Sequence, residues 1–309
     1  MTHSLPFSGV ESQILSQVPL NRRTTWRIGG VTRWLATPKN CEELAQLWRQ
    51  SADDIPRFLL GGGSNILVED SGFNGLAVNL SQHINQIKLL DDDEGLQIMA
   101  EAGASTSALA HFARLHSLTG AEFLGGIPGT IGGAVKMNAG ANGGDIAKIL
   151  INAQLLDCNG NSHIWPVEKL GLGYRKSQIP KGWIFVKGTF KLKHGEQKAI
   201  KEKMRQFNQH RLKSQPLNYA SAGSTFKNPT KGPAAWKLID DAGFRGMRIG
   251  DAQVSEKHSN FLVNLGKATS YDMLALIDKI REKVIQKTGE SLNLEVAILG
   301  PQGFRGKDL

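Results

Sequence analysis

Short apolar stretches of strand type alternate with stretches of helical periodicity along almost the whole chain. Apolar runs and apolar/polar alternation predict strands at residues 31–36, 57–60, 66–68, 76–80, 153–158, 163–167, 183–192, 252–255, 261–265 and 292–298. Helical periodicity predicts a helix at 105–117, a stretch rich in Lys, Glu and Gln predicts a polar helix at 196–213, and further helices are predicted at 234–242 and 271–287. Because both patterns occur throughout, the pattern predicts a mixed α+β fold.

Local signals sharpen some of these elements. Asn40 followed by Glu43 has the form of a capping box and predicts a helix that opens there and ends near Gln50. The acidic turn Asp91–Glu94 separates strand patterns at 87–90 and 96–101 and predicts a hairpin. The glycine-rich segment Gly125–Gly144 interrupts the pattern and is expected to form long loops.

The chain has 309 residues, enough for two or three domains with cores of their own. The polar helix predicted at 196–213 ends before Pro216 and marks a boundary. We therefore expect a region of residues 1–200, with two lobes at about 1–85 and 86–200, followed by a smaller domain of residues 201–309.

Several protein classes are disfavoured by simple features of the sequence. The two cysteines, Cys41 and Cys158, lie far apart, and no Cys/His cluster has the spacing of a zinc site. We expect two free thiols and no metal. The N-terminus lacks the pattern of a signal peptide, and the apolar runs are too short to span a bilayer. These features predict a soluble cytoplasmic protein.

Positive charge is concentrated in one stretch of the chain. The sequence has 37 Lys and Arg against 28 Asp and Glu, and residues 181–248 hold 15 of the basic residues and 4 of the acidic ones. Three interpretations follow: a solvated helix face, a pocket for a multiply charged anion such as a nucleotide, or a nucleic-acid surface. Nucleic acid ranks last, because the stretch has few aromatic residues and no nucleic-acid module.

Glycine is abundant, with 35 residues, and clusters at 29–30, 61–63, 125–126, 132–133 and 143–144. Such clusters form tight turns, and their backbone N–H groups can also converge on an anion. No Walker A motif occurs, and Ile66 stands where a Rossmann fingerprint starting at Gly61 would need its last glycine. The loops therefore favour a phosphate-rich cofactor bound without a Rossmann fold.

The glycine-rich segments, together with several other short motifs, resemble those of the UDP-N-acetylenolpyruvoylglucosamine reductase family. The resemblance runs in order from about Thr24 to Gly300. Its segments are Thr24–Gly30, Leu60–Asn65, Gly125–Ala134, Met137–Gly140, Gly173–Ser177, Ala222–Pro229 and Glu295-Val296. It implies a two-lobed FAD-binding region of the vanillyl-alcohol-oxidase type, followed by a smaller α+β substrate-binding domain. The compact segment between Tyr174 and Ser224 is similar to the shorter branch, which lacks an insertion carrying a substrate-facing tyrosine.

The resemblance implies reduction of UDP-N-acetylglucosamine enolpyruvate to UDP-N-acetylmuramate for peptidoglycan, with FAD as cofactor and NADPH as hydride donor. Neither His nor Cys occurs in the 61–65 and 125–134 loops, which favours non-covalent FAD. The remaining alternative is another FAD oxidoreductase with the same cofactor fold and a different anionic substrate.

The resemblance also implies roles for individual residues. Ser224 would donate a proton, Arg175 would bind the substrate carboxylate, and Glu295 would stabilise the intermediate as a carboxyl with a raised pKa. The cofactor would be bound by Arg27, Gly61, Gly62, Gly63, Ser64, Asn65, Gly125, Ile127, Pro128, Gly129, Thr130, Gly132, Gly133, Ala134 and Asn138. Lys227, Asn228, Lys237 and His258 are candidates for the nucleotide part of the substrate. The chain departs from the family pattern at Asp251 and Asn142.

Overall fold

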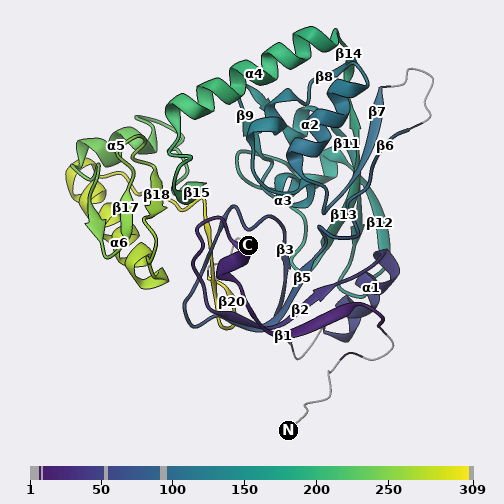
Figure 1. Cartoon of the computed structure of the whole chain (residues 1–309), viewed down its shortest axis with the longest axis horizontal. Coiled ribbons are helices and arrows are strands. Elements are labelled where there is room, and N and C mark those ends of the chain that lie inside the picture. Colours follow the sequence, from purple (N-terminus) through teal and green to yellow (C-terminus); the bar gives the residue numbers. More distant parts are fainter. Residues whose placement is uncertain (1–6, 8–9, 52–54, 91–95, 306–309) are drawn as a thin grey trace. The chain divides into compact units, whose positions relative to one another are not determined.

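The computed structural model describes residues 7, 10–51, 55–90 and 96–305 (Figure 1). Its helices are α1 Cys41–Gln50, α2 Thr106–Leu115, α3 Ile131–Lys136, α4 Gln197–Ser214, α5 Ala235–Asp241 and α6 Ser270–Thr288. Short 3-10 helices are η1 Asn21–Arg23, η2 Glu122–Gly126, η3 Ile146–Lys148 and η4 Val167–Leu170.

The strands of the first half are short, and most belong to one of two sheets. They are β1 Gln13–Pro19, β2 Val31–Thr37, β3 Arg57–Leu60, β4 Ile66–Val68, β5 Phe73–Asn79, β6 Ile87–Leu89, β7 Gln97–Glu101, β8 Leu118–Thr119, β9 Gly140–Ala141 and β10 Gly144–Asp145. The later strands are β11 Leu150–Leu156, β12 Ser162–Pro166, β13 Ile184–Lys191, β14 Lys193–His194, β15 Ala220–Ser224, β16 Arg248–Ile249, β17 Ala252–Val254, β18 Phe261–Asn264, β19 Ala297–Gly300 and β20 Gly303–Phe304.

The chain forms two compact units, and each unit is built from separate stretches of sequence. The first unit takes residues 1–16, 34–62 and 76–209, and the second takes 17–33, 63–75 and 210–309. Each unit has a hydrophobic core of its own. The second core includes Trp26 and Leu67 beside residues of the C-terminal region.

In the first unit, a five-stranded sheet has the order β12-β11-β13-β7-β6. All of its pairings are antiparallel, and α3 packs against β7 and β13. A four-stranded sheet has the order β1-β2-β5-β3, with β3 and β5 parallel.

In the second unit, the sheet β15-β18-β17-β16 is antiparallel, and α6 packs against β16, β17 and α5. A smaller sheet pairs β19 in parallel with β4 and antiparallel with β20. The fold is therefore mixed α+β, as predicted. The pairing of β4 with β19 places β4 in the same unit as the C-terminal strands.

Most sequence-predicted elements are confirmed. The structure contains the predicted helices as α1, α2, α4, α5 and α6, and β6 pairs with β7 as the predicted hairpin. The acidic turn Asp91–Glu94 lies outside the described residues. Both cysteines are free thiols, as expected.

Two predictions of secondary structure, one for the glycine-rich segment and one for the last strand, were wrong. The segment expected to be loop, Gly125–Gly144, contains the short helix α3. The strand expected at 292–298 is limited to its last part, since β19 begins at Ala297 and Glu295 lies in a bend. The backbone N–H of Glu295 donates to the carbonyl of Thr225 at 2.9 Å, in place of a regular strand ladder.

Helix α6 shows why the amphipathic pattern was a reliable signal. Its buried residues include Met273, Leu276, Ile280 and Val284, which share one face of the helix. The Thr269 side chain accepts from the N–H of Asp272 at 3.1 Å, and the Asp272 carboxylate accepts from the N–H of Thr269 at 2.9 Å. This capping box satisfies two of the N–H groups at the start of the helix.

We predict that Thr269→Ala destabilises the protein by about 1 kcal/mol, because one N–H of the first turn loses its acceptor. Urea unfolding monitored by circular dichroism measures the loss. Tyr271→Ala, a change at a strongly exposed position of the same helix, is the control. Equal stability of Thr269→Ala and the native protein would contradict the importance of the cap.

Candidate active site

Two glycine loops meet in the first unit. Gly61 and Gly62 follow β3, while Gly129 and Thr130 precede α3. A Cβ atom on Gly61 would lie 2.7 Å from the Oγ1 atom of Thr130, and one on Gly62 would lie 2.8 Å from the Cα atom of Gly129. Such distances leave no room for a side chain, so the contact requires glycine. The structure thus brings together the two loops that the sequence singled out.

The backbone N–H groups of these loops differ in what they bind. The N–H groups of Ile131 and Gly132 donate to the carbonyls of Ala104 and Ala102, at 2.8 and 2.9 Å. Among the described residues, no acceptor takes the N–H of Gly61 or Gly62. An anion with several oxygen atoms, such as a diphosphate, fits donors of this kind. The loop after β3 therefore fits the diphosphate of FAD better than the start of α3 does.

Asn138, two residues after the end of α3, bonds to two neighbouring segments. It is buried, its Nδ2 donates to the carbonyl of Gly173 at 3.1 Å, and its Oδ1 accepts from the N–H of Ala147 at 2.9 Å. Both ends of the side-chain amide are thus bonded to backbone. Asn138 shapes the loop and also holds Gly173, at the start of the turn that carries Arg175.

Arg175 lies in this tight turn of the first unit. Gly173 and Lys176 exchange two backbone hydrogen bonds, at 3.1 and 3.2 Å, and Arg175 has a positive φ of 53°. Its guanidinium donates to the carbonyl of Gly140 at 3.3 Å and lies 5.2 Å from the centre of the Tyr174 ring. The turn therefore presents a half-buried arginine in a restricted orientation.

The segment around Arg27 belongs to the second unit. Trp26 is fully buried, its Nε1 donates to the carbonyl of Leu262 at 2.8 Å, and its own carbonyl accepts from Asn264 at 2.9 Å. Arg27 has a positive φ of 59° and is exposed. The N–H of Thr25 donates to the carbonyl of Gly63 at 3.0 Å, so the Arg27 segment lies beside the Gly63–Asn65 part of the first glycine loop.

Ser224 and Glu295 are brought together in the second unit. Ser224 is the last residue of β15, after Gly223 with a φ of +77°, and the register of β15 against β18 shifts just before it. Glu295 donates its N–H to the carbonyl of Thr225, and its own carbonyl accepts from the Nδ2 of Asn65 at 3.0 Å. The residue after Ser224 is therefore bonded directly to Glu295.

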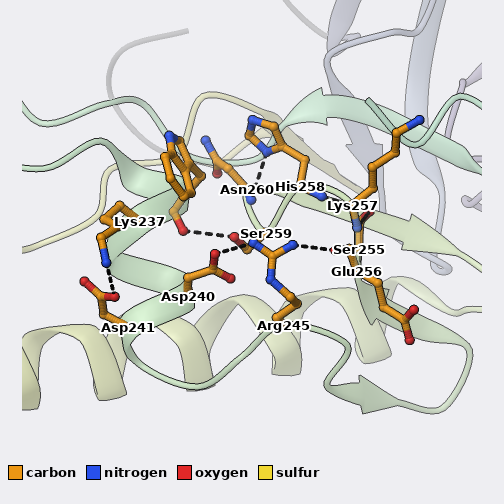
Figure 2. A network of polar contacts seen from close by, with 11 residues as sticks. Lys237, Asp240, Asp241, Arg245, Ser255, Glu256, Lys257, His258, Ser259 and Asn260 are labelled. Atoms are coloured by element: carbon orange, nitrogen blue, oxygen red, sulfur yellow. Dashed lines mark hydrogen bonds and ion pairs between the residues drawn. The ribbon is translucent and has the colours of Figure 1, made fainter. Parts of the chain in front are cut away.

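The substrate candidates have varied surroundings in the second unit. Lys227 bonds through its backbone to Asn293, and the Asn228 side chain accepts from the N–H of Ala235 at the start of α5. The ammonium of Lys237 pairs with Asp241 (Figure 2). Burial lowers the pKa of His258, whose Nδ1 accepts from the N–H of Asn260. Lys237 and His258 are thus weaker cationic sites for a diphosphate than their residue types suggest.

A hollow of about 260 Å³ lies in the same unit. It is lined by Pro216, Leu217, Asn218, Tyr219, Gln253, Ser255, Glu256, Lys257 and Val263. Part of the basic stretch borders it, while α4 exposes most of its basic residues and has Ile200 as its buried residue. The structure therefore supports a solvated face along α4.

The two departures from the family pattern have structural explanations. Asp251 pairs with Arg248 at 3.0 Å and accepts from the backbone N–H of Lys267 at 3.0 Å, which braces the turn between β16 and β17. Asn142 has a φ of 52°, a left-handed conformation that asparagine tolerates better than most residues.

Sequence reasoning missed a buried carboxylate that supports the second glycine loop. Glu122 opens η2, which ends at Gly126, and its side chain is 3% exposed. It accepts from the hydroxyl of Thr119 at 2.5 Å and the N–H of Gly120 at 2.9 Å, and it pairs with Lys203 of α4 at 3.4 Å. Burial raises the pKa of Glu122, but these donors outweigh it and hold the pKa below its usual value.

A second missed residue is Asn260, which the sequence offered only as a polar residue beside an apolar strand. It is buried, with 3% of its surface exposed, and bonds to both the N–H and the carbonyl of Phe226. Its contacts lie next to Ser224 in the chain.

The fold and the glycine loops define an α+β flavoprotein whose FAD-binding region is not of the Rossmann type. Residues 33–164 match the family described as FAD binding domain. Residues 215–299 match the family described as UDP-N-acetylenolpyruvoylglucosamine reductase, C-terminal domain.

Similar proteins agree with this class. A UDP-N-acetylenolpyruvoylglucosamine reductase of Magnetococcus marinus is 52% identical over 301 residues, which cover 97% of this chain and 96% of the relative. One of Caldanaerobacter subterraneus is 44% identical over 292 residues, 94% of this chain and 95% of the relative. The crystal structure of the Thermus caldophilus reductase covers 93% of this chain and 98% of its own, with 36% identity and a TM-score of 0.78. The chain belongs to the UDP-N-acetylenolpyruvoylglucosamine reductase family.

The described residues contain neither a membrane-spanning helix nor a cluster of metal ligands. No helix there is long and apolar enough to cross a bilayer. Nor do three or more His, Cys, Asp or Glu side chains gather in that part of the chain in a way that would hold a metal ion.

We predict that Gly62→Ala lowers the FAD content of the purified protein at least tenfold, because the new Cβ atom would collide with the backbone of Gly129. Absorbance of the flavin relative to protein measures the content. Gly143→Ala is the control, since a Cβ atom there meets nothing within 4 Å and only its φ of +82° is unfavourable. Full FAD occupancy in Gly62→Ala would show that the loops can separate without losing the cofactor.

We predict that Glu122→Gln destabilises the protein by about 2 kcal/mol at pH 7, because the ionised carboxylate accepts two hydrogen bonds and pairs with Lys203. A lowered carboxyl pKa stabilises the folded state above the pKa of the unfolded chain, and this contribution is lost as the pH falls through the folded-state value. The difference between the two proteins should therefore shrink below about pH 4.5. Urea unfolding at several pH values tests this, and a difference independent of pH would contradict it.

Proposed function

We propose that this protein reduces UDP-N-acetylglucosamine enolpyruvate to UDP-N-acetylmuramate, a peptidoglycan precursor, with NADPH as hydride donor and non-covalent FAD. The observation that carries the proposal is the hydrogen bond from the backbone N–H of Glu295 to the carbonyl of Thr225, the residue after Ser224. It supports the proposal because the two residues that would supply the hydroxyl and the carboxyl of the reaction, Ser224 and Glu295, have neighbouring backbones in the second unit. Family membership supports the choice of substrate.

FAD would be held by the two glycine loops around Gly61–Gly63 and Gly129–Thr130, and when bound it would supply the hydride chemistry, with NADPH as the hydride source and the methylene carbon of the enolpyruvyl group as the acceptor. As the new C–H bond forms, the electron pair of the double bond moves to the α-carbon and the adjoining carboxylate. The α-carbon then needs a proton. Ser224 donates it from its hydroxyl and recovers a proton from water, so that one hydride and one proton complete the reduction.

The negative charge that develops on the substrate must be stabilised. Arg175 binds the substrate carboxylate, to which its planar guanidinium can donate two parallel hydrogen bonds. Glu295, as a protonated carboxyl, donates a hydrogen bond to the same region, which requires a raised pKa. An ionised Glu295 would repel the developing charge.

The nucleotide part of the substrate is assigned to the second unit. Lys227 and Asn228 follow Ser224 within four residues, and the hollow of about 260 Å³ in the same unit is lined by Tyr219 and Lys257. Lys237 and His258 contribute less, given the ion pair of the first and the lowered pKa of the second. In this assignment residues 1–200 bind FAD and residues 201–309 bind the substrate. We place the reaction in the cytoplasm and assign no nucleic-acid partner.

We predict that Ser224→Ala slows reduction of the enolpyruvyl group by about 10²–10⁴-fold, because the proton donor is lost. Bleaching of the flavin by NADPH should stay within about twofold of the native rate, since Ser224 takes no part in that step. Stopped-flow absorbance follows both steps separately, first with NADPH alone and then with substrate.

Ser221→Ala is the matched control, a serine change three residues earlier in the same strand β15. It should leave both steps at native rates. Native-like reoxidation by substrate in Ser224→Ala would overturn the role of Ser224. A flavoprotein that NADPH bleaches but this substrate does not reoxidise would favour a different anionic substrate.

A further inference from the structure

Asn260 makes an unusually complete set of contacts with the chain just after Ser224. Its Oδ1 accepts from the N–H of Phe226 at 2.9 Å, and its Nδ2 donates to the carbonyl of the same residue at 2.8 Å. Its backbone carbonyl accepts from the N–H of Thr225 at 2.8 Å. The two residues after Ser224 are therefore both bonded to one buried asparagine, which lies 34 positions beyond Phe226 in the sequence.

The Thr225 peptide is held from the opposite side by the Glu295 segment. The carbonyl of Thr225 accepts from the N–H of Glu295, and Phe226 forms an isolated bridge with Leu294. Asn260 therefore contacts the same two residues that set the position of Glu295. Any displacement of Thr225 and Phe226 would change the distance between the side chains of Ser224 and Glu295.

Asn260 is itself held by a network between α5 and β18 (Figure 2). Its N–H donates to the Nδ1 of His258 at 3.3 Å, and the hydroxyl of Ser259 donates to the carbonyl of Trp236 at 2.9 Å. Arg245 pairs with Asp240 and donates to the carbonyl of Glu256. The loop that carries Asn260 is thus bonded to α5 directly through Trp236 and, by way of Arg245, through Asp240.

We infer that Asn260 is a positioning residue that sets the Ser224 hydroxyl against the reacting α-carbon and in register with Glu295. The inference rests on the proposed function, since that function assigns Ser224 as the proton donor. A buried amide that bonds to both polar groups of one residue restricts rotation and translation of that residue. Because a displacement of about 1 Å at a reacting group can cost about 10²-fold in rate, the loss of this constraint affects proton delivery selectively.

The experiment compares Asn260→Asp and Asn260→Ala with the native holoenzyme. Aspartate has nearly the same shape and keeps an acceptor for the N–H of Phe226, but it places a second oxygen against the carbonyl. We expect reduction of the enolpyruvyl group to slow by about 20–100-fold in both variants, with FAD content and NADPH-driven bleaching within twofold of native. The fall should appear in kcat, with KM for the substrate within about threefold.

Ser270→Ala is the matched structural control. Ser270 is buried in the same unit, where its hydroxyl bonds to Asp70 at 2.8 Å, so its loss should lower stability without touching the Thr225 peptide. If Asn260 acts through Ser224, adding Asn260→Asp to Ser224→Ala should slow the reaction by less than a further threefold. If Asn260 had a merely structural role, Asn260→Asp would slow the reaction by the same factor in the native protein and in Ser224→Ala.

The native protein provides a readout that does not depend on whether the variants fold. The N–H of Phe226 should resist hydrogen exchange as strongly as the core of β18, and rapid exchange would overturn the inference. The inference would also be overturned if Asn260→Asp slowed both half-reactions equally. It would be overturned as well if both half-reactions kept their native rates and only the stability fell, as expected for Ser270→Ala. If Ser224→Ala alone leaves proton delivery unchanged, the proposed role of Ser224 fails, and that failure is separate from the result for Asn260.

Discussion

The hydrogen bonds to the Thr225 peptide are the constraint on which the proposed chemistry depends. The N–H of Thr225 donates to the carbonyl of Asn260 and its carbonyl accepts from the N–H of Glu295, so two segments far apart in sequence meet at one residue. Because the peptide is buried, losing either bond would leave a polar group unsatisfied at a cost of about 1–3 kcal/mol. The same bonds that stabilise the second unit therefore fix the backbone of Glu295 beside the residue that follows Ser224.

The cofactor region depends on a different constraint, the close approach of two glycine loops. Packing backbone against backbone leaves N–H groups of the Gly61–Gly62 loop available, while those of α3 are used within the protein. Glycine is disfavoured inside helices by about 1 kcal/mol, yet α3 contains Gly132 and Gly133. The carbonyls of Ala102 and Ala104 accept hydrogen bonds from the first turn of α3. Because these partners lie outside the helix in sequence, the local pattern of residues 131–136 did not predict a helix.

Periodic and local features could be predicted from the sequence, and long-range polar contacts could not. Helix α6 was predicted because its apolar residues repeat with the period of a helix. The glycine loops were predicted because the residues that favour a turn are neighbours in the sequence. Glu295 was misplaced in a strand because Leu294 and Val296 alternate around it, although its backbone bonds to Thr225 rather than to a ladder. Asn260 and Glu122 carried no pattern of their own, since each matters only through partners that the folded chain brings to it.

The interleaving of the two units restricts how such a protein can be rearranged. The chain passes from one unit to the other at residues 16–17, 33–34, 62–63, 75–76 and 209–210. A cut near residue 210 would remove Trp26 and Leu67 from the second core and would deprive β19 of its parallel partner β4. Neither unit is therefore a module that recombination could exchange as one continuous gene segment, and the two must be inherited together.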